Sequence, residues 1–163
     1  MRASLEQHLG SRQVGKVVYG AIIGLALIVA LESHPPKPWV MAVWLTGTAL
    51  AVGLAEVYSE IVGTETSTRR PVTRPDVGHM LDDAVAVGFG VAFSAVFFVL
   101  AALDIVEVEA AFSIAKWSGL GLIGFYGYWA ARFAGAPAHR ALFKGALVAL
   151  IGAGLILLKS LVH

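Results

Sequence analysis

Five apolar stretches, each long enough to cross a lipid bilayer as a helix, take up most of this sequence. They cover about residues 14–32, 39–62, 81–103, 110–132 and 140–160. A helix rises about 1.5 Å per residue, so about 20 apolar residues cross a hydrocarbon layer of about 30 Å. The sequence therefore predicts an all-α integral membrane protein with five transmembrane helices, in which residues 1–163 form a single membrane domain.

The composition of the chain agrees with a membrane protein and excludes several kinds of site. Its 163 residues are 58% hydrophobic and 14% charged, and the mean hydropathy is +0.77, whereas a soluble domain carries about 25% charged residues. The chain contains no cysteine, which excludes disulfides, thiolate metal ligands and cysteine nucleophiles. It also lacks the motifs of phosphate-binding loops, serine hydrolases and zinc proteases. We therefore predict that the protein is not an enzyme and holds no resident cofactor.

The first apolar stretch follows a basic N-terminal segment, as the apolar part of a signal peptide does. A signal peptide ends in small residues at its cleavage site. Here the segment LESHPPKP follows instead, with bulky and charged residues. We expect this stretch to remain as a transmembrane helix.

Basic residues gather in the segments at one end of the predicted helices. They are Arg2, Arg12 and Lys16 at the first helix, Arg69, Arg70 and Arg74 between the second and third, and Arg132, Arg140 and Lys144 around the fourth and fifth. The segment DIVEVE at the other end is acidic. Because cytoplasmic loops are enriched in Lys and Arg, we predict a cytoplasmic N-terminus and a C-terminus outside, in a plasma membrane of the bacterial type.

The connection over residues 64–80 is rich in Arg, Thr and Pro, and we expect it to be short and irregular. We interpret its arginines as an orientation signal and predict no nucleic-acid partner. A patch for lipid headgroups or nucleic acid is the alternative interpretation.

Glycines inside the apolar stretches predict closely packed helices. Gly20 and Gly24 form a G-x-x-x-G pattern, which lets helix backbones approach in a membrane. Flexible, gated helices are the alternative. Further glycines reduce the side-chain volume of the fourth and fifth stretches. They are Gly119, Gly121, Gly124, Gly127, Gly145, Gly152 and Gly154.

Two carboxylates lie inside the second apolar stretch, one helical turn apart. If the inner boundary of the membrane lies near Thr64, Glu60 is about 6 Å deep and Glu56 about 12 Å deep. Glu60 can reach the interface by itself, but Glu56 lies below the small residues Gly53 and Ala49 on one helix face. Glu56 is therefore a candidate functional acid. A neutral carboxyl and a structural hydrogen bond are the alternatives.

The third apolar stretch begins with acidic residues at the same side of the membrane. Asp82 and Asp83 lie in its first turn, where the helix dipole favours carboxylates, and this capping role alone explains them. They also lie where Glu56, Glu60 and His79 can converge. Such oxygen ligands with one imidazole suit a divalent cation such as Mn²⁺, Fe²⁺ or Ca²⁺, and Glu56 and Asp83 are the candidate metal ligands.

Two features of the fourth stretch concern the membrane boundaries. Lys116 lies near the outer end, where it either pairs with Glu32 or Asp104 or extends its ammonium group outward. At the inner end, aromatic residues predict an interfacial belt, formed by Tyr126, Tyr128 and Trp129.

The segment AEVYSE resembles the Gly-Glu-Tyr-x-Ser motif that ends the second span of the vacuolar iron transporter-like superfamily. Glu56 takes the glutamate position and Ser59 the serine position, while Ala55 replaces the glycine and the tyrosine falls one residue late, at Tyr58. The Gly-rich closing hairpin is also similar. The resemblance implies five spans, a cytoplasmic N-terminus and a dimer whose subunits enclose a path for metal and proton exchange. The first-span aspartate of the family is replaced by Tyr19, and its cytoplasmic metal-binding domain is absent.

The sequence therefore leads to two hypotheses about function. The first is a small transporter or channel for a cation, a divalent metal above all, with coupling to protons through Glu56. The second is a membrane scaffold or accessory subunit that transports nothing. Because five short spans enclose little volume, we expect any path to lie between subunits of a homodimer.

Overall fold

A computed structural model describes the chain from Gln13 to Val162; beyond Leu150, side chains are described only at Gly152, Ala153, Gly154 and Leu157. The described residues form helices and no strands, so the all-α prediction is confirmed for this part of the chain. The helices are α2 (Gln13–Leu31), α3 (Pro38–Thr68), α4 (Arg74–Ala92), α5 (Ala95–Ala102), α6 (Val108–Phe133) and α7 (Ala138–Val162).

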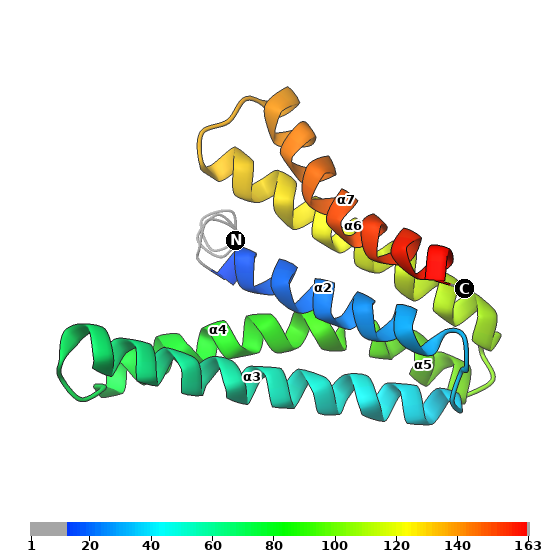
Figure 1. The fold of residues 1–163 in the computed structure, drawn as a ribbon, viewed down its shortest axis with the longest axis horizontal. Coiled ribbons are helices and arrows are strands. Elements are labelled where there is room, and N and C mark those ends of the chain that lie inside the picture. Colours follow the sequence, from blue (N-terminus) through cyan, green and yellow to red (C-terminus); the bar gives the residue numbers. More distant parts are fainter. Residues whose placement is uncertain (1–12, 163) are drawn as a thin grey trace.

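The helices run back and forth, and α2 lies between the pair α3 and α4 and the pair α6 and α7, which is tilted away from α3 and α4 (Figure 1). Helix α2 packs against α4 on one side and against α6 on the other, while α3 packs along α4. Helices α6 and α7 form an antiparallel hairpin (Figure 1). The start of α2, the end of α3 and the start of α4 therefore lie at the same end of the molecule.

Some of these helices are long and apolar enough to cross a membrane. Among the described residues, α2 and α3 satisfy this requirement individually. Helices α4 and α5 satisfy it together, as one span bent by 46°. The structure thus has two or three candidate spans. The predicted five spans and the predicted orientation remain predictions.

The third apolar stretch, expected as one helix over 81–103, is divided by this bend. Helix α4 ends at Ala92, and α5 begins at Ala95. Next to the buried Ser94, the N–H group of Phe97 donates to the carbonyl of Ser94 at 3.3 Å, an i to i+3 bond tighter than that of an α-helix. The bend lets α5 contact both α3 and α6. There, the buried rings of Phe98 and Phe112 meet with their centroids 4.9 Å apart.

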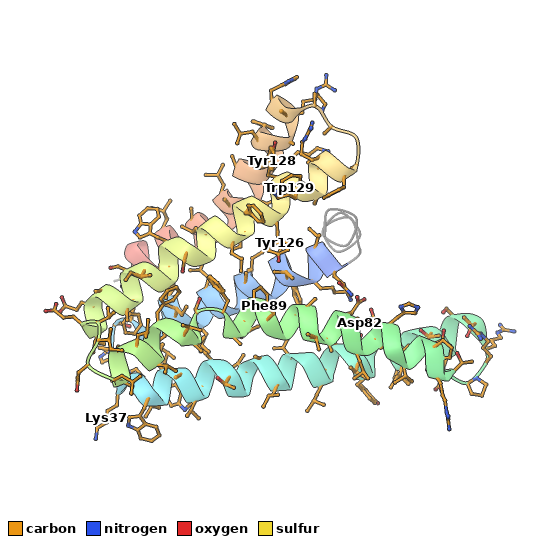
Figure 2. All side chains as sticks on the ribbon, turned by 180° about the vertical axis from the view of Figure 1, so that it is seen from behind. Lys37, Asp82, Phe89, Tyr126, Tyr128 and Trp129 are labelled. Atoms are coloured by element: carbon orange, nitrogen blue, oxygen red, sulfur yellow. The ribbon has the colours of Figure 1, made fainter. Side chains whose placement is uncertain are left out.

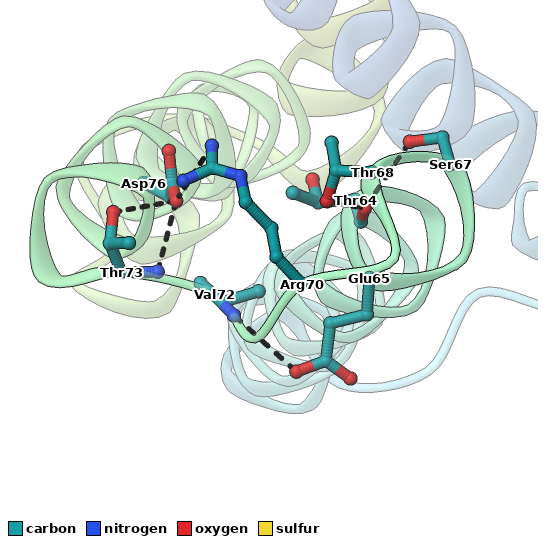
Figure 3. A network of polar contacts seen from close by, with 8 residues as sticks. All are labelled: Thr64, Glu65, Ser67, Thr68, Arg70, Val72, Thr73 and Asp76. Atoms are coloured by element: carbon teal, nitrogen blue, oxygen red, sulfur yellow. Dashed lines mark hydrogen bonds and ion pairs between the residues drawn. The ribbon is translucent and has the colours of Figure 1, made fainter.

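The connection between α3 and α4 is shorter than the irregular segment expected over 64–80. Helix α3 continues to Thr68 and ends where Arg69 adopts a left-handed conformation, with φ of 52°. Helix α4 begins at Arg74, because Thr73 and Asp76 form a capping box. Figure 3 shows its bonds: the amide and hydroxyl of Thr73 donate to Asp76 Oδ2 at 2.9 and 2.6 Å. Only residues 69–73 are irregular.

Because α4 begins at Arg74, the predicted position of Asp82 and Asp83 in the first turn of this helix is wrong. Both lie two turns further along α4, where the helix dipole does not explain them.

The predicted close packing is confirmed at several glycines. A Cβ atom on Gly20 would lie 2.0 Å from the carbonyl oxygen of Val87, and one on Gly24 would lie 3.0 Å from that of Val91. Across the interface, a Cβ on Gly90 would lie 2.3 Å from Val17 O. In the α6–α7 hairpin, a Cβ on Gly145 would lie 2.8 Å from Gly124 O. By contrast, Gly121 and Gly154 have open space around them, so packing does not explain those two.

Candidate functional site

The ammonium group of Lys16 lies among three carboxylates from two other helices. Lys16 is in the first turn of α2, and its Nζ donates hydrogen bonds to Oε1 of Glu56 and, at 2.9 Å, to Oε1 of Glu60. Asp83 Oδ2, on α4, is 3.8 Å from the same nitrogen. Helices α2, α3 and α4 thus each contribute charge to one point, which we call the Lys16 cluster (Lys16, Glu56, Glu60 and Asp83).

The four side chains are largely shielded from solvent. The exposed fraction is 23% for Lys16, 16% for Glu56, 20% for Glu60 and 10% for Asp83. Charges in such surroundings attract each other more strongly than at an open surface, and each is costly without a partner. Within the cluster, the three carboxylates share the ammonium group of Lys16.

The positions of these residues along their helices explain why they meet. Glu56 and Glu60 are four residues apart on α3, so they lie on one face and repel each other. Lys16 relieves this repulsion by donating to both. Above Glu56 on the same face, Gly53 lies near Ala84 of α4, where a Cβ atom would be 3.4 Å from the Ala84 carbonyl oxygen. This small pair lets α3 and α4 come close near the cluster.

The structure thus brings together three of the five predicted site residues: Glu56, Glu60 and Asp83. Asp82 is exposed and faces a different hollow of about 320 Å³, which it lines together with Gln13 and Tyr126 (Figure 2). His79 is also exposed and does not contact the Lys16 ammonium group.

His79 instead lines a polar hollow between the end of α3 and the start of α4. This hollow measures about 440 Å³. It has hydroxyl, carboxylate and imidazole groups in its wall, from Ser59, Glu60, Thr64, Ser67, Asp76 and His79. Glu60 belongs to both the hollow and the Lys16 cluster. A small ion or molecule in the hollow would therefore be next to the cluster.

The predicted metal ligands meet around an ammonium group. Among the described residues, no group of three or more His, Asp or Glu side chains has the arrangement of a metal site. Glu56 and Asp83 both approach Lys16 Nζ. Carboxylates around a lysine can hold one positive charge, exchange it for another cation, or take up a proton.

Lys16 was not predicted as a site residue, but only as part of the orientation signal. A signal was present, because Lys16 lies inside the first apolar stretch, near its start. In an up-and-down bundle, the start of the first helix and the end of the second lie at the same level. A lone lysine at one and a pair of glutamates at the other are therefore candidates for an ion pair.

A second ion pair lies at the opposite end of the bundle. Lys116 Nζ on α6 donates to Oε1 of Glu32, just after α2. Of the three alternatives left open for Lys116, the structure therefore selects the pair with Glu32, and the ammonium group does not extend outward on its own.

No protein-family model, curated protein or solved structure matches this chain. The resemblance to vacuolar iron transporter-like proteins therefore remains a prediction from the motif around Glu56.

Proposed function

We propose that the protein is a small multi-pass membrane transporter or channel for a cation, and that Glu56, Glu60 and Asp83 bind the cation. The observation that supports this proposal is the Lys16 cluster, in which three shielded carboxylates from two helices gather around the ammonium group of Lys16. Lys16 then serves as an internal cation, which the transported ion displaces.

The energetics of buried charge favour a functional role for such a cluster. Ionisable groups within membrane helices cost about 2.5–3.5 kcal/mol each on insertion scales. Stability alone does not require them, since well-packed apolar residues often serve as well as a buried ion pair. Glu56 and Glu60, one turn apart on α3, repel each other. A mobile cation that binds there in place of Lys16 would relieve that repulsion.

The polar hollow that contains Glu60 and His79 provides the route in this proposal. It opens at the end of α3 and the start of α4, the end we propose to be cytoplasmic. We propose a divalent metal as the ion and protonation of Glu56 as the coupled step. A homodimer would complete the path, because α3 has a large apolar face that α4 does not cover, with Leu50, Leu54 and Tyr58 exposed.

Uptake of Mn²⁺ into proteoliposomes tests this proposal. We expect wild type to accumulate Mn²⁺, and Glu56→Gln and Asp83→Asn to lose at least about tenfold in rate, a barrier change of about 1.4 kcal/mol. Asp82→Asn is the matched control, since Asp82 is the chain neighbour of Asp83 but lies outside the Lys16 cluster. Equal uptake by wild type and Glu56→Gln would remove Glu56 from the mechanism.

A scaffold or accessory subunit is the second candidate. The pairing of the three carboxylates with Lys16 favours it. Lys16 approaches all three carboxylates, so the cluster can act purely as a clamp between α2, α3 and α4. In that case Glu56→Gln lowers the melting temperature in detergent, while Mn²⁺ changes it in neither protein.

A further inference from the structure

A groove runs between α6 and α7 near the turn that joins them. It has a volume of about 540 Å³ and a mostly apolar wall. Its wall is formed by Gly124, Phe125 and Tyr128 on α6 and by Ala138, His139 and Leu142 on α7. Phe125 and Leu142 are 51% and 66% exposed, so the groove faces the surroundings of the bundle. It shares no residue with the Lys16 cluster or the polar hollow.

The chemistry of the groove changes in order along α6. Phe125 contributes carbon surface. Tyr128 and Trp129, which are labelled in Figure 2, follow one turn later, and Arg132 follows after another turn. Residues four and seven apart share a helix face, so Arg132 lies on the same face of α6 as the wall residues Phe125 and Tyr128, within about 10 Å along the helix. Trp129 contacts Phe125 and Tyr128, with ring centroids 6.3 and 5.6 Å apart. Such an aromatic group is typical of the headgroup level of a bilayer.

Arg132 lies just beyond the groove wall, one turn after Tyr128 and next to the turn that leads to Ala138. Its Nη1 donates to the carbonyl oxygen of Ala136 at 3.1 Å, in the turn just before Ala138. A guanidinium group has five N–H donors, and it binds phosphate well because two of them can point the same way. His139 is in the groove wall at the same end. No acidic side chain is among the residues that form the wall.

We propose that this groove binds an anionic phospholipid. The phosphate lies against Arg132 and His139, the glycerol region lies beside Tyr128, and one acyl chain follows Phe125 and Leu142. Charge complementarity favours an anionic lipid over a zwitterionic one, because two basic side chains stand at the headgroup level and the wall offers a choline group no carboxylate. The apolar length of the groove favours a lipid over free phosphate.

Thermal unfolding of the full-length protein in detergent tests this proposal, with native mass spectrometry as a second measurement. We expect phosphatidylglycerol to raise the melting temperature of wild type. Phosphatidylcholine with the same acyl chains should raise it less, and inorganic phosphate should not raise it. Arg132→Gln should weaken phosphatidylglycerol binding about tenfold, as expected for the loss of one hydrogen bond to a charged group. His139→Gln should weaken it in the same direction.

Arg140→Gln is the matched control, because Arg140 is exposed next to His139 but, at about 100° per residue, lies on the other side of α7 from the wall residues Ala138 and Leu142. It should retain phosphatidylglycerol binding within about twofold, since a distant surface charge adds little. The proposal would be overturned if phosphatidylcholine or inorganic phosphate raised the melting temperature as much as phosphatidylglycerol does. It would also be overturned if Arg140→Gln weakened phosphatidylglycerol binding as much as Arg132→Gln does. Native mass spectrometry counts bound lipid on the folded protein, so a less stable variant still gives an answer.

Discussion

Gly20 of α2 lies so close to Val87 of α4 that a Cβ atom on the glycine would be 2.0 Å from the valine carbonyl oxygen. The obstacle is backbone, which no side-chain rotation can move. The absence of a side chain at Gly20 therefore sets how closely α2 and α4 approach. Since α2 carries Lys16 and α4 carries Asp83, the same contact helps to set the spacing in the Lys16 cluster.

Gly20→Ala should destabilise the protein by about 1–3 kcal/mol, the usual cost of an overpacked interface. Gly15→Ala is the control on the same helix, because a Cβ there has nothing within 4 Å. Alanine is the better helix former by about 1 kcal/mol, so Gly15→Ala should be neutral or stabilising. Thermal unfolding in detergent measures both. Equal melting temperatures for the two variants would contradict the close approach.

Lys16→Gln should lower stability by about 1–3 kcal/mol, because three shielded carboxylates lose a charged partner. Lys144 is exposed, so Lys144→Gln should change the free energy of unfolding by no more than about 0.5 kcal/mol. If the cluster is a cation site, Lys16→Gln should also bind Mn²⁺ more tightly than wild type, since no internal ammonium competes. Calorimetric titration measures this affinity. A loss of stability with no gain in Mn²⁺ affinity would favour the scaffold function.

The pair of Lys116 and Glu32 should show a coupling of about 0.5–1 kcal/mol in a double-mutant cycle. Both side chains keep some contact with solvent, with exposed fractions of 18% and 34%, so screening reduces their attraction. Lys116→Met, Glu32→Gln and the combined variant are unfolded thermally for this measurement. If the two single effects simply add, the pair contributes no net interaction.

The proposed orientation can be mapped with single cysteines, since the chain has none of its own. Ser67→Cys, near the end of α3, should react with a membrane-impermeant maleimide only when the cytoplasmic face is accessible. His34→Cys, between α2 and α3, should react from the outside. Both native residues are exposed, so burial does not limit the reaction. The opposite pattern of labelling would reverse the topology.

Sequence periodicity and hydropathy predicted most of the helices because each depends on local residues. The start of α2 and the α6–α7 hairpin follow from local signals, whereas the pairing of Lys116 with Glu32 was one of three alternatives that the sequence left open. The bend at Ser94 could not be predicted in this way, since the flanking residues of α4 and α5 are uniformly apolar. It depends on how α5 packs against α3 and α6, which is a tertiary effect.

Only part of the candidate site could be predicted, because its remaining features also depend on tertiary packing. Depth alone brought Glu56, Glu60 and Asp83 to one level, but depth does not say which way a side chain points around its helix. Asp82 and Asp83 are neighbours in the chain, and yet only Asp83 approaches Lys16. The rotation of α4, fixed by its contacts with α2, decides between them.

The separation of Lys16 from Glu56 has a consequence for how the protein is made. The two residues are 40 positions apart, so Lys16 leaves the ribosome well before the carboxylate that neutralises it. If α2 and α3 enter a membrane in turn, we expect the ammonium group to remain at the water interface until Glu56 arrives, which its place in the first turn of α2 allows. We then expect this ion pair to link the insertion of α3 to the final depth of α2.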